Sequence, residues 1–77
     1  MEHQRNNVTK IQHPTKPEVE IHTALLTLLP GTEEAAEFVE IREFNNVADI
    51  YGHGILVPLA VAPEVYGGIR HAINDAD

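Results

Sequence analysis

The chain has 77 residues, enough for one small domain and too few for a cofactor domain beside a substrate domain. It contains no cysteine, which excludes disulfides, thiolate zinc sites and cysteine nucleophiles. Its formal net charge is −7, and an acidic surface disfavours direct binding of nucleic acid or an anionic membrane while favouring a basic protein partner.

The first 17 residues differ from the rest in charge. They carry three basic side chains against one acidic, a net charge of +2, whereas residues 18–77 carry two basic against eleven acidic, a net charge of −9. Val8 and Ile11 are the large apolar residues of this segment, too few to offset its ordering entropy. We therefore expect a flexible basic arm over residues 1–17 and a single acidic globular domain over residues 18–77.

Residues 17–29 admit two interpretations. Apolar residues alternate as in a strand, but Ile21, Leu25 and Leu28 also follow helical spacing. Pro17 suits a first helical position, and Pro30-Gly31 is a strong stop signal. We favour a helix over this segment and keep a strand over 19–29 as the alternative.

Residues 32–44 begin with a capping threonine and good helix formers, which predicts a second helix. Arg42 and Phe44 fall on the wrong sides of that helix, so it should distort or end near Ile41. Its carboxylates would gather on one side. We call this set the acidic ridge, and it is the candidate binding surface: Glu33, Glu34, Glu37, Glu40 and Glu43.

The last third of the chain is more apolar. Residues 47–51 suit one further turn closed by Gly52, and the run 55–61 suits a buried extended segment. Pro63 begins the clearest helix, whose Gly67-Gly68 pair costs about 2 kcal/mol relative to alanine. The stripe on this helix should pack into the core or a self-interface; it comprises Val65, Ile69, Ala72, Ile73 and Ala76, bordered by Tyr66.

These elements predict a mainly α fold: a small three-helix domain with one short extended apolar segment and a flexible N-terminal arm. The alternative is an α+β fold, with paired strands at 19–29 and 55–61 beneath the final helix.

The sequence gives little support for catalysis. The five histidines include no HxxxH or HxH pair, and we expect no metal site and no cofactor. His53 stands out because it lies between two glycines, which allow close backbone approach. Serine and cysteine are absent, and no nucleophile-elbow, phosphate-loop or zinc-hydrolase motif is present. We expect the protein not to be an enzyme.

The functional expectation is an acidic binding protein. It would dock the acidic ridge on a basic surface of a larger protein, including one that handles nucleic acid, as an inhibitor or adaptor. The alternative is a small homo-oligomeric structural or assembly subunit that uses residues 55–61 and the final helix as its interface. Without a leader or a long apolar span in this sequence, we expect a cytoplasmic location and no membrane partner.

Overall fold

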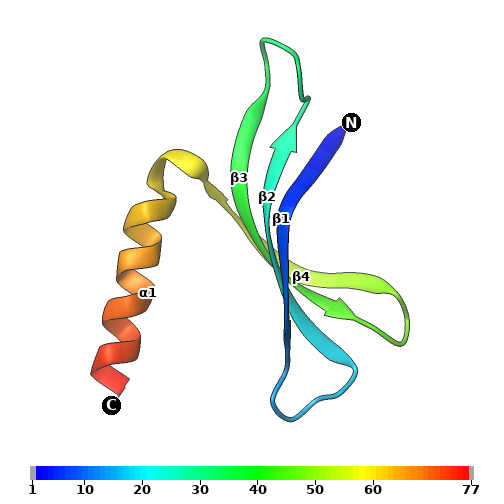
Figure 1. The fold of residues 1–77 in the computed structure, drawn as a ribbon, viewed down its shortest axis with the longest axis vertical. Coiled ribbons are helices and arrows are strands. Elements are labelled where there is room, and N and C mark those ends of the chain that lie inside the picture. The colour runs from blue at the N-terminus through cyan, green and yellow to red at the C-terminus, as the bar shows by residue number, and fades with distance from the viewer. Residues whose placement is uncertain (1, 77) are drawn as a thin grey trace.

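A computed structural model describes residues 2–76, with side chains through residue 74, and shows an antiparallel sheet followed by a helix (Figure 1). The four strands of the described chain lie in the order β1-β2-β3-β4, and each pairs with the next. A 3-10 turn, η1, leads into the helix α1. The bounds are β1 His3–Gln12, β2 Val19–Leu28, β3 Ala36–Asn45, β4 Ile50–Pro58, η1 Leu59–Val61 and α1 Ala62–Ala76.

The prediction of a mainly α, three-helix domain is wrong. The segments 17–29 and 32–44, expected to be helices, form β2 and β3. In β3 the side chains of Arg42 and Phe44, which fit no helical face, lie on the same side of the sheet because strand residues alternate with a period of two. Valine, isoleucine and phenylalanine also favour strands when cross-strand neighbours are available, and this outweighs the helix propensity of the glutamates.

The flexible arm is also corrected, because residues 3–12 form β1 at one edge of the sheet. The prediction considered only the apolar surface that residues 1–17 could bury by themselves. In the structure, β1 is held by its main-chain pairing with β2. The α+β alternative is wrong in its pairing, since β3 separates β2 from β4 and both of these strands pair with it. Of the extended run expected over 55–61, residues 55–58 lie in β4, whereas residues 59–61 form η1.

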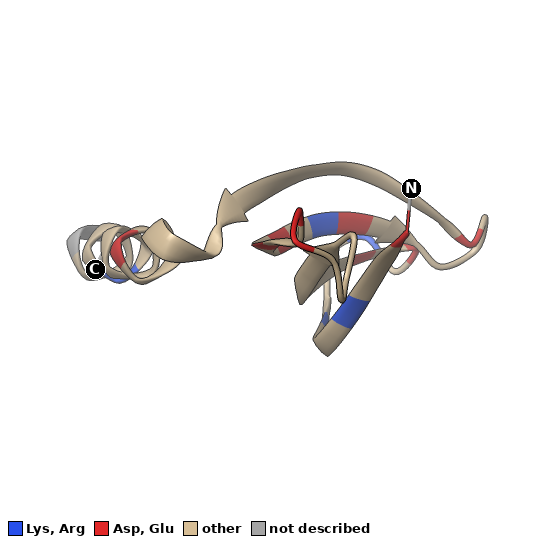
Figure 2. Cartoon of the chain, turned by 90° about the horizontal axis from the view of Figure 1, so that it is seen from above, with Lys and Arg blue, Asp and Glu red and all other residues tan. Residues whose placement is uncertain are grey.

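The helix predicted from Pro63 onward is confirmed as α1, but it does not lie over the sheet. Figures 1 and 2 show α1 beside the sheet, joined to it through the end of β4. Its neighbours are η1 and β4. The helix therefore leaves much of one sheet face uncovered.

The strand register divides the side chains between two faces, which differ in character. The polar face includes Arg5, Lys10, Glu20, His22, Glu40, Arg42, Phe44 and Tyr51, together with Ala24, Leu26 and Leu56. The apolar face includes Ile11, Ile21, Thr23, Leu25, Val39, Ile41, Ile55 and Val57. An apolar face is normally the buried side of a sheet, but here the polar face is the more deeply buried one.

The buried core of this chain is very small. Among the described residues, the buried apolar side chains are Ala24, Leu26 and Val57, and the buried polar side chains are His22 and Glu40. Many large apolar side chains are exposed instead, on the apolar face and on α1. A single copy of the chain thus leaves many of its large apolar side chains exposed to water.

Candidate functional site

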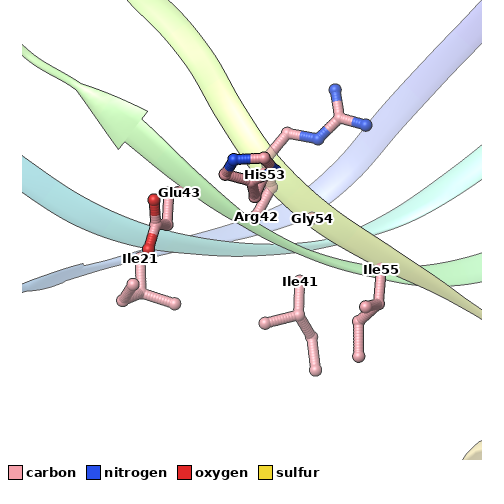
Figure 3. Close-up of a pocket in the computed structure, with 7 residues that line it drawn as sticks. All are labelled: Ile21, Ile41, Arg42, Glu43, His53, Gly54 and Ile55. Carbon is pink, nitrogen blue, oxygen red and sulfur yellow. The ribbon is translucent and has the colours of Figure 1, made fainter.

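The apolar face is built by alternate residues of three strands. Figure 3 shows Ile21, Ile41 and Ile55, from β2, β3 and β4, pointing to the same side of the sheet while Arg42 extends to the other. Ile55 lies on the edge strand and is 57% exposed. Branched side chains in such a row are typical of a sheet face that packs against another layer.

The helix α1 presents a second apolar surface. Val65, Ile69 and Ile73 are spaced four residues apart and lie along one side of the helix. Ile69 is 46% exposed and Ile73 is 57% exposed, so the expected packing of this stripe into the core of its own chain does not occur. The side chain of Ala76, which the sequence adds to the stripe, lies outside the described part of the chain.

A groove of about 560 Å³ separates α1 from the apolar face. It is open on one side, and nearly all of its lining is apolar. The sheet and η1 contribute Thr23, Val39, Ile41, Val57 and Leu59, and α1 contributes Ala62, Pro63, Val65, Tyr66 and Ile69. An apolar groove of this kind, continuous with an exposed apolar face, is a candidate association surface rather than a catalytic pocket.

The polar face is organised around the buried carboxylate of Glu40. Arg5 donates two hydrogen bonds to it, from Nε to Oε1 at 2.7 Å and from Nη2 to Oε2 at 3.1 Å. Arg42, two residues along β3 on the same face, is also close to this carboxylate, with 3.7 Å between its Nε and Oε2 of Glu40. The hydrogen bonds from Arg5 lower the pKa of Glu40, while burial opposes this shift, and the same pairing raises the pKa of Arg5.

His22 forms a second polar cluster on this face. Its Nε2 lies 2.9 Å from Oε1 of Glu20, and its Nδ1 lies 3.2 Å from the hydroxyl of Tyr51. Because a carboxylate only accepts, Nε2 carries the proton, and in the neutral ring Nδ1 accepts from the tyrosine. The ring also stacks on Phe44 at 4.8 Å. The hydrogen bond from His22 lowers the pKa of Glu20, aided by a second one from Asn46.

The structure does not gather the acidic ridge on one surface. Glu33 and Glu34 lie in the β2–β3 turn, while Glu37 and Glu43 lie on the apolar side of β3. Glu40 lies on the polar face, where it is buried and paired with Arg5. The single helical face assumed for these carboxylates is absent because β3 alternates them between two sides of the sheet.

Sequence reasoning missed the residues that pair on the polar face: Arg5, His22, Arg42 and Tyr51. A signal exists for Arg42, because the period-two pattern of residues 38–44 sets it on one face with Glu40. Arg5 and Tyr51 have no such signal, because they reach the site through the pairing of distant strands.

Within the described residues, no group of three or more histidine and acidic side chains is placed to hold a metal ion. The helix found there is too short and too polar to cross a bilayer. Comparisons of the chain with models of protein families, with curated proteins and with solved structures found no match.

Proposed function

We propose that this chain is a non-catalytic, homo-oligomeric structural or assembly subunit, with a dimer as its smallest unit. The interface comprises the apolar face and the stripe of α1. The observation that supports this proposal is the uncovered apolar surface: Ile55, Ile69 and Ile73 are each about half exposed. Contiguous apolar surface is rare on soluble monomers and marks association sites.

The small core supports the same proposal. Ordering a chain costs about 1.5 kcal/mol per residue, and small domains without disulfides or metals commonly gain the missing stability by self-association. Here the apolar side chains buried within the described chain are Ala24, Leu26 and Val57. A second copy covering the apolar face would enlarge this core to include residues such as Ile41 and Ile69.

A second copy is the occupant that the geometry favours over an unrelated protein. The apolar face and the α1 stripe line one groove and belong to one patch of the surface. In a two-fold dimer the same patch is buried on both copies, as isologous interfaces require. Protein–protein interfaces of standard size bury ~800 Å² per partner, about one-seventh of the 5779 Å² surface of this chain.

The proposal is tested by a matched pair of substitutions on β4. Ile55 lies on the apolar face, and the next residue, Leu56, lies on the polar face with a similar exposure of 43%. In sedimentation equilibrium we expect the wild type and Leu56→Lys to be dimeric. We expect Ile55→Lys to raise the dimer Kd by at least about a hundredfold, because an ammonium buried without a partner costs several kcal/mol.

A second measurement applies if Ile55→Lys fails to fold. The thermal midpoint of the wild type should rise with protein concentration, because dissociation accompanies unfolding of an obligate dimer. A wild type that is folded, monomeric at every concentration and constant in its midpoint would overturn the proposal. Equal loss of association in Ile55→Lys and Leu56→Lys would also overturn it, because the apolar face would then have no special role.

Docking on a basic surface of a larger protein is the second candidate function. The observation that favours it is the exposure of Glu33, Glu34 and Glu37 at and beside the β2–β3 turn, away from the pairing of Glu40 with Arg5. We expect Glu33→Gln/Glu34→Gln to weaken binding to a basic partner in low salt more than the control Asp49→Asn/Glu64→Gln does. Equal effects would mean that net charge alone matters.

A further inference from the structure

Two arginine side chains meet on the polar face, one from an edge strand and one from an inner strand. Cζ of Arg5, on β1, lies 5.4 Å from the centre of the Tyr51 ring, and Cζ of Arg42, on β3, lies 5.7 Å from the same point. Both guanidinium groups also lie beside the carboxylate of Glu40. Two cations therefore share one aromatic ring and one carboxylate, which leaves this cluster with one positive charge in excess.

Arg42 has hydrogen-bonding capacity that its own chain does not use. Arg5 donates two hydrogen bonds to Glu40, whereas Nε of Arg42 is 3.7 Å from Oε2, beyond hydrogen-bonding distance. This Nε is buried and has no hydrogen-bond partner among the described residues. Figure 3 shows the guanidinium of Arg42 extending away from the other labelled side chains. The Arg5 and Arg42 side chains are 26% and 30% exposed, so a ligand can reach both of them.

A β-bulge in each edge strand brings the cluster together. The register of β1 with β2 shifts shortly after Arg5, where two residues of β1 lie opposite one of β2 and Asn7 has a φ of 55°. The register of β4 with β3 shifts directly after Tyr51, where two residues of β4 lie opposite one of β3. Bulges bend a strand and redirect its side chains. Arg5 and Tyr51 therefore meet although two strands separate them in the sheet.

Gly54 leaves the space that Arg42 occupies. These two residues are direct partners in the pairing of β3 with β4, and a Cβ at Gly54 would lie 2.8 Å from Nε of Arg42. Glycine inside a strand weakens it and commonly marks a close approach of another group. Two bulges and this glycine thus coincide at the two arginines, and bulges are over-represented beside functional sites.

We propose that Arg5 and Arg42 bind a carboxylate ligand on the polar face, beside the Tyr51 ring. The guanidinium fork matches the two oxygens of a carboxylate, and contact with an aromatic face holds each fork in place. A carboxylate is favoured over a phosphate group because its single charge balances the excess charge of the cluster. A second negative charge would be repelled by a chain whose net charge is −7. The site lies on the opposite face of the sheet from the proposed interface and does not depend on it.

Titration of the wild type at pH 7 and constant ionic strength tests the proposal, with the arginine Nε–H signals as the readout. We expect sodium acetate to shift the signals of Arg5 and Arg42 with saturation, and sodium chloride to leave them nearly unchanged. Tetraglutamate at equal carboxylate concentration distinguishes two sources of the ligand. Tighter binding than acetate would support the site and indicate an acidic peptide, while equal binding would support it and indicate a free acid.

Two results of these titrations would overturn the proposal. Equal shifts with acetate and chloride would mean that any anion acts by screening the cluster. Binding of inorganic phosphate at least about tenfold tighter than acetate would mean that the ligand class is wrong. Because these results do not depend on the oligomeric state, either of them would leave the proposed homodimer standing.

A matched pair of variants locates the site. Arg42→Met should raise the acetate Kd at least about tenfold, because it removes hydrogen bonds to a charged ligand and leaves the pair of Arg5 with Glu40 in place. Lys10→Met removes one positive charge from the same face but lies outside the cluster, and it should raise the Kd less than about twofold. Equal effects would contradict the proposal, and should Arg42→Met not fold, the titrations of the wild type decide the matter.

Discussion

Arg5 on β1 binds Glu40 on β3 across the intervening strand β2, through two hydrogen bonds of 2.7 and 3.1 Å. The small side chain of Ala24, the neighbour of Glu40 on β2, leaves room for the guanidinium to cross. This pair joins the first strand of the sheet to the third, and it supplies hydrogen-bonding partners for a carboxylate that is only 2% exposed.

Replacing Arg5 with methionine should lower the free energy of unfolding by about 1–3 kcal/mol, because it removes both hydrogen bonds from a buried carboxylate while keeping an aliphatic stem. Lys10→Met is the matched control, since Lys10 lies on the same strand and polar face and is exposed. Urea unfolding at one fixed protein concentration measures both variants. Equal effects would show that only positive charge on β1 matters.

The stability of the fold should depend on pH through Glu40, whose pKa is lowered by the hydrogen bonds from Arg5. Between this lowered value and the unfolded value of about 4.3, the unfolded chain binds more protons than the folded one, so stability rises with pH. The contribution of Glu40 is complete above the unfolded pKa and is lost as the pH falls through the folded pKa.

This dependence can be isolated by unfolding measurements from pH 7 downward, since Arg5→Met should flatten the loss of stability in acid. Glu20 has a lowered pKa of its own, caused by the hydrogen bond from His22, and both proteins should therefore carry Glu20→Gln. A slope unchanged by Arg5→Met would show that Glu40 does not carry this pH dependence.

The glycines on either side of His53 should respond differently to alanine. A Cβ at Gly54 would lie 2.8 Å from Nε of Arg42 and 2.9 Å from the carbonyl oxygen of Ile41, whereas at Gly52 the nearest atoms are 3.7 Å away. Gly54→Ala should cost about 1–3 kcal/mol of stability, because the main chain of β3 must move, while Gly52→Ala should cost less. Thermal unfolding compares them, and a larger effect at Gly52 would contradict this account of the β3–β4 contact.

Replacing Tyr51 with phenylalanine should cost about 1 kcal/mol, because it removes the hydroxyl that donates to Nδ1 of His22 and keeps the ring. The imidazole ¹⁵N shifts of His22 should retain the Nε2–H tautomer, which Glu20 fixes independently. Phe44→Leu is a useful comparison, since it removes the ring stacked on His22 and leaves both hydrogen bonds. A change of tautomer in Tyr51→Phe would show that Tyr51 rather than Glu20 selects it.

The amino-acid pattern was sufficient to predict α1, because Pro63 marks its start and the apolar residues repeat with one helical period. It was not sufficient for β2 and β3. Apolar residues in 19–29 satisfy both a period of two and a helical spacing, and the glutamates of 33–43 are good helix formers in isolation. Neighbouring strands decided between these alternatives by supplying hydrogen bonds and cross-strand contacts.

The sequence by itself determined the acidic charge, the absence of cysteine, the final helix and its apolar stripe, because each depends on composition or on local spacing. The tertiary structure alone decided that residues 3–12 join the sheet, that the acidic ridge is divided between two faces, and that Arg5 pairs with Glu40. The physical reason is that a strand has no partner of its own. Its hydrogen bonds, and the side of the sheet on which each residue lies, are set by strands distant in the chain.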